Sequence, residues 1–378
     1  MRIGIDGRLW NETGVGRYIR NLVDNLTIID TKNQYVLFVT SETAVAFKTH
    51  DKTFPDNWKI VRCDIRWHTI AEQLELPRVL DKEKLDLMHF PYFSVPLLYR
   101  KPFVITIHDL IVHHFPTGKA STLPAPIYYA KHASYKFIIK NAAKRAQKVI
   151  AVSNATKQEI IDHLEIPARK IDVTYEGVDP QFLSNTITTV KQFEIDDISY
   201  LLYVGNAYPH KNLERLITAF ELALSDNPDL KLVLVGKKNY FYTKLSEYVH
   251  KKKLGKSIIF FGQASDGELQ SLYQHATACI FPSLMEGFGL PGLEALQSGC
   301  LLLASDIPVF REMYKDTALY FDPLVPESIH ATIQQVLSAK TSFTERKRQG
   351  KKLAQSFSWE TMSQQTQKVY LAANRSWS

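Results

Sequence analysis

Two glutamates in the stretch 277–299, TACIFPSLMEGFGLPGLEALQSG, have the type and spacing that could bind a polar ligand. The apolar run 277–281 predicts a buried parallel strand, which a glycine loop and then a helix follow. A helix that begins directly after a strand presents free backbone N–H groups and the positive end of its dipole, which attract anions such as a diphosphate. Glu286 in the loop and Glu294 inside the helix add two carboxylates. Together these features suit a ligand with both phosphate and hydroxyl groups, such as a nucleotide sugar.

A second glycine loop lies near the start of the chain. Residues 2–5 predict a strand, and Gly14 and Gly16 come just before an amphipathic helix. Because glycine has no Cβ, the backbone at these positions can approach a ligand closely. The spacing differs from the GxGxxG dinucleotide fingerprint and disfavours a Rossmann dehydrogenase. Taken alone, this loop is equally typical of a backbone contact with an anion and of an ordinary helix start.

A histidine and an aspartate, His108 and Asp109, follow the predicted strand 102–107. Open parallel sheets bind ligands beyond the carboxyl ends of their strands, so this histidine is well placed for chemistry. Its ring can donate or accept a hydrogen bond near neutral pH. The alternative is a buried histidine that bonds only to backbone.

A third strand-to-helix junction carries a lysine. The predicted strand 199–204 ends at Gly205, and the loop that follows contains Pro209, His210, Lys211 and Asn212 before a helix begins. Lysine is a compact point charge that suits phosphate oxygens. This loop therefore predicts a second anion contact.

These segments occur in an order that resembles the glycosyltransferases of family 4. The phrase EGFGLP…E, which contains Gly287, Phe288, Gly289 and Leu290, is similar to the signature of that family, and the Gly14–Arg17 loop, the His108–Asp109 pair and the Lys211–Asn212 loop match its other elements. The resemblance covers essentially the whole chain. It implies an α/β protein of GT-B fold, in which two doubly wound, Rossmann-like domains with parallel sheets face a central cleft.

The resemblance also implies roles for individual residues. Glu286 is expected to bond hydroxyls of the transferred sugar, Glu294 the ribose hydroxyls, and Lys211 the phosphates. His108 is expected to lie against the donor sugar, and we group it with Glu286 and Lys211 as the catalytic set. The remaining expected donor contacts are Gly14, Gly16, Arg17, Asn206, His210, Gly287, Phe288, Gly289 and Leu290.

One part of the family pattern is missing. His210 and Asn206 stand at the two places where related sequences carry an arginine beside the phosphates. Half of the usual cationic clamp is therefore absent, and either Arg17 or a protonated His210 is expected to supply the charge. The chain also has no D-x-D motif, which favours a metal-independent reaction in which fixed charges and helix starts stabilise the leaving group.

Length and pattern predict two domains. The 378 residues exceed one ordinary core, and 45% hydrophobic with 22% charged residues is typical of a globular protein. Short apolar runs alternate with amphipathic stretches, as in parallel sheets covered by helices. We expect a first, acceptor-side domain at 1–184, a linker at 185–197 and a second, nucleotide-sugar-binding domain at 198–357. A final helix at 358–378, with Trp359, Met362, Val369 and Ala373 on one face, is expected to return to the first domain.

The strands are expected at particular apolar runs in each half. In the first half they fall near 2–5, 35–40, 58–63, 86–90, 102–107, 148–152 and 171–174. In the second half they fall near 199–204, 231–235, 257–261, 277–281, 300–304 and 318–321. This arrangement gives one sheet to each domain.

The remaining composition points to a cytoplasmic protein. No apolar run is long enough for a membrane span, and no signal peptide precedes the first strand. The three cysteines, Cys63, Cys279 and Cys300, have neither disulfide nor zinc spacing and are expected to be buried thiols. The net charge of +7 favours anionic partners, among which the resemblance selects a nucleotide sugar and not nucleic acid.

A lysine-rich stretch at 125–148 could contact a membrane surface. Lys136, Lys140, Lys144 and Lys148 recur every four positions, so a helix would place them in one stripe. Such a stripe can lie against anionic lipid headgroups at the inner face of a membrane. The alternative is the solvated face of an ordinary helix.

The expected function is a retaining transfer of a hexose from a nucleotide diphosphate sugar to a hydroxyl of a glycan or lipid-linked acceptor. Similar sequences often transfer mannose in polysaccharide assembly, so GDP-mannose is the expected donor. Two alternatives remain: a nucleotide-sugar epimerase of similar fold, and a non-catalytic binder of nucleotide sugars. The glycine loop with its two glutamates speaks against the first, and the missing arginine favours the second.

Overall fold

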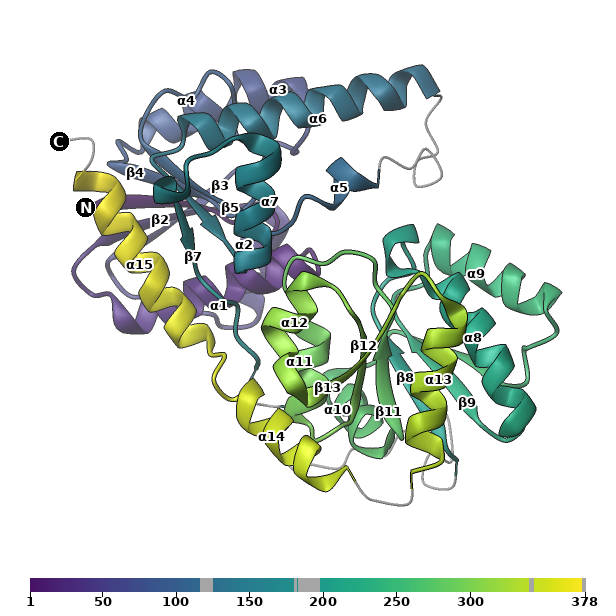
Figure 1. The fold of residues 1–378 in the computed structure, drawn as a ribbon. Helices are drawn as coiled ribbons and strands as arrows, with labels where there is room; N and C mark the ends of the chain where they lie inside the picture. Colours follow the sequence, from purple (N-terminus) through teal and green to yellow (C-terminus); the bar gives the residue numbers. More distant parts are fainter. Residues whose placement is uncertain (116–124, 180–181, 183–197, 340–342, 376–378) are drawn as a thin grey trace. The chain divides into compact units, whose positions relative to one another are not determined.

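A computed structural model describes residues 1–115, 125–179, 182, 198–339 and 343–375. The chain divides into two compact units (Figure 1). Unit 1 consists of Met1–His113, Leu123–Gly177 and Ser358–Ser378, and unit 2 consists of His114–Thr122 and Val178–Phe357. The linker expected at 185–197 lies outside the described residues.

Unit 1 is built on a parallel sheet with the strand order β3-β2-β1-β4-β5-β6-β7 over the described residues. The strands are β1 (Arg2–Asp6), β2 (Gln34–Val39), β3 (Trp58–Arg62), β4 (Leu87–Phe90), β5 (Phe103–Ile107), β6 (Lys148–Ala151) and β7 (Ile171–Val173). Its longer helices are α1 (Gly14–Ile29), α2 (Ser41–Thr49), α6 (Ala125–Arg145), α7 (Asn154–Leu164) and α15 (Trp359–Arg375). Shorter helices are α3 (Ile70–Leu74), α4 (Leu76–Lys82) and α5 (Ile111–His114).

Unit 2 has a parallel sheet with the order β10-β9-β8-β11-β12-β13 over its described residues. The strands are β8 (Tyr200–Val204), β9 (Lys231–Val235), β10 (Ile258–Gly262), β11 (Ala278–Phe281), β12 (Leu302–Ser305) and β13 (Ala318–Phe321). The helices are α8 (Leu213–Asp226), α9 (Tyr240–Lys251), α10 (Asp266–His275), α11 (Leu290–Gln297), α12 (Pro308–Tyr314), α13 (Pro326–Leu337) and α14 (Thr344–Ala354). Helix α8 packs on α9 and α13, and α11 packs on α12 and α14 (Figure 1).

The strand positions predicted from the apolar runs are confirmed, with ends that differ by one or two residues. The central strands are buried along their whole length because helices cover the sheet, which is why they appear in the sequence as continuous apolar runs. The helices begin at recognisable caps. Ser153 and Asn239 accept bonds from the first backbone N–H groups of α7 and α9, and Ser265 with Glu268 forms a capping box on α10.

The last helix, α15, belongs to unit 1 and packs against α1. Ser358 accepts a bond from the backbone N–H of Thr361, as expected for an N-cap. The predicted apolar face is buried, and Tyr370 of the same helix donates or accepts a hydrogen bond of 2.6 Å with His89 in the core of unit 1. At the start of α15, a Cβ on Gly177 would overlap the backbone of Ser358 and Trp359, so the two segments can meet only because Gly177 has no side chain.

The four lysines of the expected basic stripe do not share one helix. Helix α6 ends at Arg145, and Lys148 begins strand β6, so the spacing of four is interrupted there. Glu165 lies 2.9 Å from Lys140 and 4.0 Å from Lys144, while Asp172 lies 3.0 Å from Lys148. These carboxylates neutralise much of the charge on which the membrane hypothesis depends.

Two further expectations can be compared with the structure. Cys63, Cys279 and Cys300 are free and buried, as the sequence predicted. Among the described helices, none has the length and apolar composition that a bilayer crossing requires.

In both sheets the strand order reverses beside the first strand of the unit. The reversal lies between β1 and β4 in unit 1 and between β8 and β11 in unit 2. In doubly wound folds, ligands bind at such a reversal, beyond the carboxyl ends of the strands. The loops after β8 and β11 contain Lys211 and Glu286, respectively.

Candidate active site

In unit 2, the loop after β8 and the loop after β11 are bonded to each other. The backbone N–H of Leu284 donates to the carbonyl of His210 at 2.8 Å. Asn212, which is buried and has a left-handed backbone (φ 60°), donates its side-chain amide to Pro282 O at 3.0 Å and to Pro323 O at 2.7 Å. Asn212 therefore fixes the position of Lys211, its neighbour, against the glycine loop.

Lys211 and Glu286 form an ion pair across these two loops. Their side chains are only 16% and 15% exposed, and Ser283 donates a second hydrogen bond of 2.7 Å to the same oxygen of Glu286. The structure thus brings together two of the three residues that the sequence grouped as catalytic. Both lie next to a helix start, because a short 3-10 turn at Pro209–Lys211 leads into α8 and Gly289 leads into α11.

The charges at this pair are well defined. Burial opposes ionisation of Glu286, but the nearby charge of Lys211 outweighs it and holds the pKa of Glu286 below its ordinary value. Burial and the charge of Lys211 both lower the pKa of His210, to about 4. His210 is therefore neutral at pH 7. The expectation that a protonated His210 replaces the missing arginine is therefore wrong, since a second buried cation beside Lys211 is unfavourable.

Packing explains why glycine is needed at two positions in and just after the EGFGLP phrase. Gly289 has a left-handed backbone (φ 92°), and the hydroxyl of Tyr314 donates to its carbonyl at 2.7 Å. A Cβ on Gly289 or on Gly292 would overlap the ring or hydroxyl of Tyr314, which is fully buried beneath the loop. Tyr314, which the sequence analysis did not single out, is thus the support on which the loop rests.

The other predicted residues of this phrase are largely buried. The ring of Phe288 packs edge-on against Phe357 at 5.8 Å, so its side chain belongs to the core of unit 2. Gly287 is buried and Leu290, which begins α11, is half-buried. Any ligand contact at Phe288 would therefore involve its backbone and not its ring.

Glu294 lies on α11 and is buried, with an exposed fraction of 2%. The hydroxyl of Tyr273 on α10 donates to Oε2 of Glu294 at 3.1 Å. The charges of Glu286 and of Glu294 both raise the pKa of Tyr314, after the larger effect of burial. The two glutamates therefore flank the same buried tyrosine, although only Glu286 is paired with Lys211.

Asn206, the first residue after Gly205, shapes the loop that carries Lys211. Its side-chain oxygen accepts from the backbone N–H of Tyr208 at 3.2 Å, and its carbonyl accepts from the hydroxyl of Tyr203 at 2.6 Å. This turn is local to the loop. Asn206 brings no positive charge to the position where related sequences have an arginine.

The first glycine loop begins α1 in unit 1, and its two glycines have different surroundings. A Cβ on Gly16 would lie 2.5 Å from Trp10 O, so Gly16 is required by the packing of the loop on the helix. Nothing lies within 4 Å of the Cβ position of Gly14, which is exposed. Only Gly14 leaves room for another molecule at the helix start. Arg17, in the first turn of α1, is half-buried.

His108 follows β5 in unit 1 and has a partner at each ring nitrogen. Nδ1 lies 3.1 Å from Oε1 of Glu176, and Nε2 lies 3.0 Å from the carbonyl oxygen of Pro91. The ring packs edge-on against Tyr18 at 4.9 Å. Burial lowers the pKa of His108, but the hydrogen bond to Glu176 and its charge outweigh burial, and the pKa is raised above its ordinary value.

Glu176 was missed by the sequence analysis. It lies three residues beyond the end of β7, directly before Gly177, so a search for acidic residues just after predicted strands would have found it. The alternative of a buried histidine bonded to backbone is half correct, since His108 bonds both to backbone and to this carboxylate.

Comparison with family models decides what kind of protein contains these loops. Residues 13–182 match the model described as Glycosyltransferase Family 4, and residues 186–355 match the model described as Glycosyl transferases group 1. The chain belongs to glycosyltransferase family 4. This family-4 chain is therefore an enzyme, a glycosyltransferase, and its two matched regions contain all the residues of the candidate site.

Curated relatives agree with this assignment, and a solved structure agrees with the fold. The family-4 chain is 28% identical to the O-antigen chain mannosyltransferase RfbU of Salmonella typhimurium over 71% of this chain and 70% of that protein. It is 26% identical to the O-antigen chain mannosyltransferase B of Escherichia coli over 95% and 96%. HepE of Anabaena, solved in complex with UDP and glucose, superimposes with a TM-score of 0.77 at 15% identity and covers 98% of this chain and 100% of that one. The predicted GT-B fold, with two parallel α/β sheets, is confirmed.

Proposed function

We propose that this glycosyltransferase transfers a hexose, with retention of its anomeric configuration, from a nucleoside diphosphate sugar to a hydroxyl of a glycan or lipid-linked acceptor. The observation that carries the proposal is the Lys211–Glu286 ion pair at the carboxyl edge of the unit 2 sheet. It combines a phosphate-binding cation with a carboxylate that can accept from sugar hydroxyls, next to two helix starts.

Each site residue of unit 2 then has a separate role. Lys211 binds the diphosphate, and this new partner releases Glu286 to bond hydroxyls of the sugar. Glu294 binds the ribose hydroxyls after it exchanges its bond with Tyr273 for the nucleotide. The first turn of α11 points its N–H groups toward the phosphates. Residues 198–357 are accordingly the donor-binding domain.

Unit 1, whose N-terminal part ends at Gly177 and not at the expected residue 184, is the acceptor-side domain in this proposal. Gly14 can let a donor approach the backbone of α1, because no described atom lies within 4 Å of its Cβ position. Arg17, one turn away, supplies positive charge that the neutral His210 does not. His108 lies against the sugar.

The reaction needs no dedicated side-chain base. The bond between the anomeric carbon and the phosphate oxygen breaks, and the acceptor oxygen forms the new bond on the same face. The acceptor proton passes to the departing phosphate oxygen, so atoms and charges balance. We also propose that the reaction is metal-independent. Support comes from the lack of a D-x-D motif in the sequence and from the presence of Lys211 and the helix starts, which can stabilise the leaving group.

Mannose is the proposed hexose, with GDP-mannose as the donor. The support is that two relatives are named O-antigen chain mannosyltransferases, one of which is matched over 95% of this chain. HepE, whose structure contains UDP and glucose, represents the alternative of a uridine nucleotide donor.

A screen of nucleotide sugars tests the proposal. A ligand that binds the native state raises the melting temperature by mass action, so GDP-mannose should stabilise the protein more than GDP-glucose, UDP-glucose or UDP-galactose. Glycan product formed with a lipid-linked acceptor should then keep the anomeric configuration of the donor, as read by NMR. An inverted product would refute retention, and an altered sugar on the unconsumed donor would favour an epimerase.

The binder alternative is separated by a second measurement on the same samples. Slow hydrolysis of a labelled donor, which disappears in Lys211→Ala and persists with excess EDTA, supports a metal-independent enzyme. Binding of a nucleotide sugar without hydrolysis or transfer under any acceptor condition would leave the chain a binder. Loss of activity with EDTA that Mg²⁺ restores would contradict metal independence.

A further inference from the structure

His108 is held by two groups that can only accept hydrogen bonds. A backbone carbonyl such as that of Pro91 has no hydrogen to donate, so Nε2 at 3.0 Å must carry one. An ionised carboxylate is likewise acceptor-only, so Nδ1, at 3.1 Å from Glu176, must also carry a hydrogen. A histidine with hydrogens on both nitrogens is an imidazolium cation.

The alternative position of the same proton is on Glu176. A protonated carboxyl group would donate to Nδ1 and leave both residues neutral, with the same two distances. Imidazole, with an ordinary pKa of about 6.5, is more basic than a carboxylate at about 4.3. The proton therefore belongs on the ring, and the His108–Glu176 contact is an ion pair whose side chains are 14% and 12% exposed.

We propose that Glu176 is a positioning residue that keeps His108 a doubly protonated, donor-only cation at the end of β5. This inference rests on the proposed function for its catalytic consequence, but the protonation state itself is a property of the protein without substrate. A cation of this kind can stabilise negative charge on the donor through its own charge, while both of its N–H groups stay bonded to Pro91 and Glu176. It cannot accept the proton of an attacking hydroxyl.

The titratable groups that contact His108 or act on its charge among the described residues are consistent with this charge. Asp109, the next residue, raises the pKa of His108 as Glu176 does, after burial has lowered it. Tyr18 on α1 contacts the ring but stays neutral, because burial raises its pKa to about 12. His89 on β4 is also neutral, because burial, together with the charge on His108, lowers its pKa to about 3.

His89 does not neutralise Glu176 in place of His108, because its ring is engaged elsewhere. It bonds Tyr370 at 2.6 Å and Thr106 at 2.8 Å, both neutral groups. Glu176 and Asp109 are thus the anions that face His108, and His108 is the cation between them.

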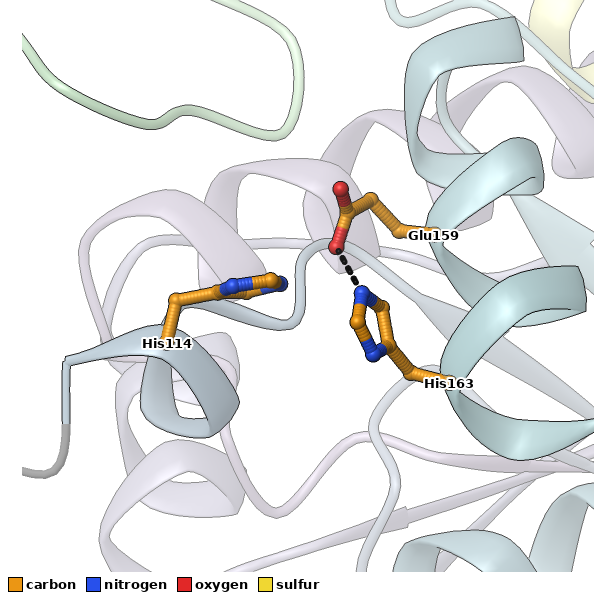
Figure 2. Close-up of side chains that lie close together, drawn as sticks. All are labelled: His114, Glu159 and His163. Atoms are coloured by element: carbon orange, nitrogen blue, oxygen red, sulfur yellow. Dashed lines mark ion pairs between the residues drawn. The ribbon is translucent and has the colours of Figure 1, made fainter.

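The same chain offers a matched control pair. Figure 2 shows Glu159 and His163, one turn apart on α7, with Oε2 of Glu159 3.4 Å from Nε2 of His163. This pair is far more exposed than the His108–Glu176 pair, so water screens it. Glu159→Gln therefore removes a carboxylate from a histidine without changing the candidate site.

The first experiment is NMR of the full chain labelled with ¹⁵N-histidine, without any substrate. At pH 7.5 the two ring nitrogens of His108 should both show protonated shifts, whereas Glu176→Gln should convert one to an unprotonated shift. The signal is assigned as the one changed by Glu176→Gln and unchanged by Glu159→Gln, and its absence from His108→Gln checks the assignment. A neutral His108 ring in the wild-type chain overturns the proposal.

The second experiment is the pH profile of kcat/KM. Activity that needs the imidazolium is present below the pKa of His108 and is lost as pH rises through it. Glu176→Gln should move this alkaline limb downward by roughly 1 to 3 pH units and regain wild-type kcat/KM at lower pH. Glu159→Gln should leave the limb unchanged. An equal loss at every pH would mean that Glu176 only supports the fold, and would overturn the proposal.

Failure of the two proposals can be distinguished. If no nucleotide sugar is consumed, the proposed function fails, while the NMR experiment still decides whether His108 is a cation. If transfer occurs but the NMR signal is neutral and the alkaline limb does not move, the function stands and the role assigned to Glu176 is wrong.

Discussion

Lys211 and Glu286 are separated by 75 residues in the chain and form an ion pair in unit 2. They follow β8 and β11, the two strands between which the strand order reverses, so the pair lies at the sheet edge where doubly wound folds bind ligands. In the free protein each group neutralises the other. In the proposed function, a bound diphosphate replaces Glu286 as the partner of Lys211, and this exchange would couple phosphate binding to the release of a carboxylate for the sugar.

Lys211→Ala should weaken nucleotide-sugar binding far more than His210→Ala. A hydrogen bond to a charged group contributes about 1.5 to 3 kcal/mol, which corresponds to roughly one to two decades in Kd. His210 has a pKa of about 4 and carries no charge at pH 6 or above. Isothermal titration calorimetry with GDP-mannose at pH 6 and pH 8 measures the Kd of each variant. A larger effect of His210→Ala at either pH would remove Lys211 as the main phosphate cation.

The two glutamates should separate in their kinetic effects. Glu286→Gln is expected to lower kcat with little change in nucleotide affinity, because its carboxylate contacts the sugar only after Lys211 has turned to the phosphates. Glu294→Gln is expected to weaken binding of GDP and of GDP-mannose alike, since both contain ribose. Steady-state kinetics and GDP titration measure the two effects. Unchanged values in both variants would rule out this assignment.

Gly14 and Gly16 should differ when each is changed to alanine. Gly16→Ala places a Cβ 2.5 Å from Trp10 O and should lower the melting temperature by several degrees. Gly14→Ala meets nothing within 4 Å and should keep the wild-type melting temperature while donor binding weakens. Thermal unfolding with and without GDP-mannose measures both. Wild-type binding by a stable Gly14→Ala would show that no donor approaches this helix start.

Gly289→Ala should destabilise unit 2. The left-handed backbone (φ 92°) and the overlap with Tyr314 together cost roughly 1 to 3 kcal/mol or more. Tyr314→Phe removes only the hydroxyl that bonds Gly289 O and is the milder companion variant, expected to cost about 1 kcal/mol. Chemical denaturation followed by circular dichroism compares them. Equal stability of Gly289→Ala and the wild type would contradict the packing described for this loop.

The stability of unit 1 should fall as pH decreases from about 6.5 toward 3. Burial lowers the pKa of His89 to about 3, so the unfolded chain binds a proton in this window that the folded chain does not. The contribution of His89 to the free energy of unfolding is therefore complete above about pH 6.5 and decreases by about 1.4 kcal/mol per pH unit below it. His89→Gln should reduce the difference between denaturation midpoints at pH 5 and pH 7. An unchanged difference would assign the acid sensitivity to other groups.

The sequence predicted what depends on neighbours along the chain. Strands such as β11 are buried apolar runs, Gly205 directly follows β8 and Gly289 directly precedes α11, so the strand positions and the loops of the site could be identified directly. Burial of Cys279 followed from its position inside such a run. Local pattern was therefore enough to place Lys211 and Glu286 at sheet edges.

The remaining features depend on how distant segments meet. Glu176 reaches His108 across 68 residues because β7 lies two strands from β5, and strand order is not encoded in any local pattern. The contact between Tyr314 and Gly289 likewise joins segments 25 residues apart, which no local pattern encodes. The charge of His210 could not be predicted either, since it depends on burial beside Lys211. For Lys148, the spacing of four suggested a helix that in fact ends three residues earlier.

Helix α15 has a consequence for synthesis of the protein on the ribosome. It completes the core of unit 1 by bonding Tyr370 to His89, although it is encoded after all of unit 2. During synthesis, most of unit 1 leaves the exit tunnel first, but the side of its core that α15 covers stays open. All residues of unit 2 leave the tunnel before α15 does. Unit 2, the later half, is the first that can finish folding.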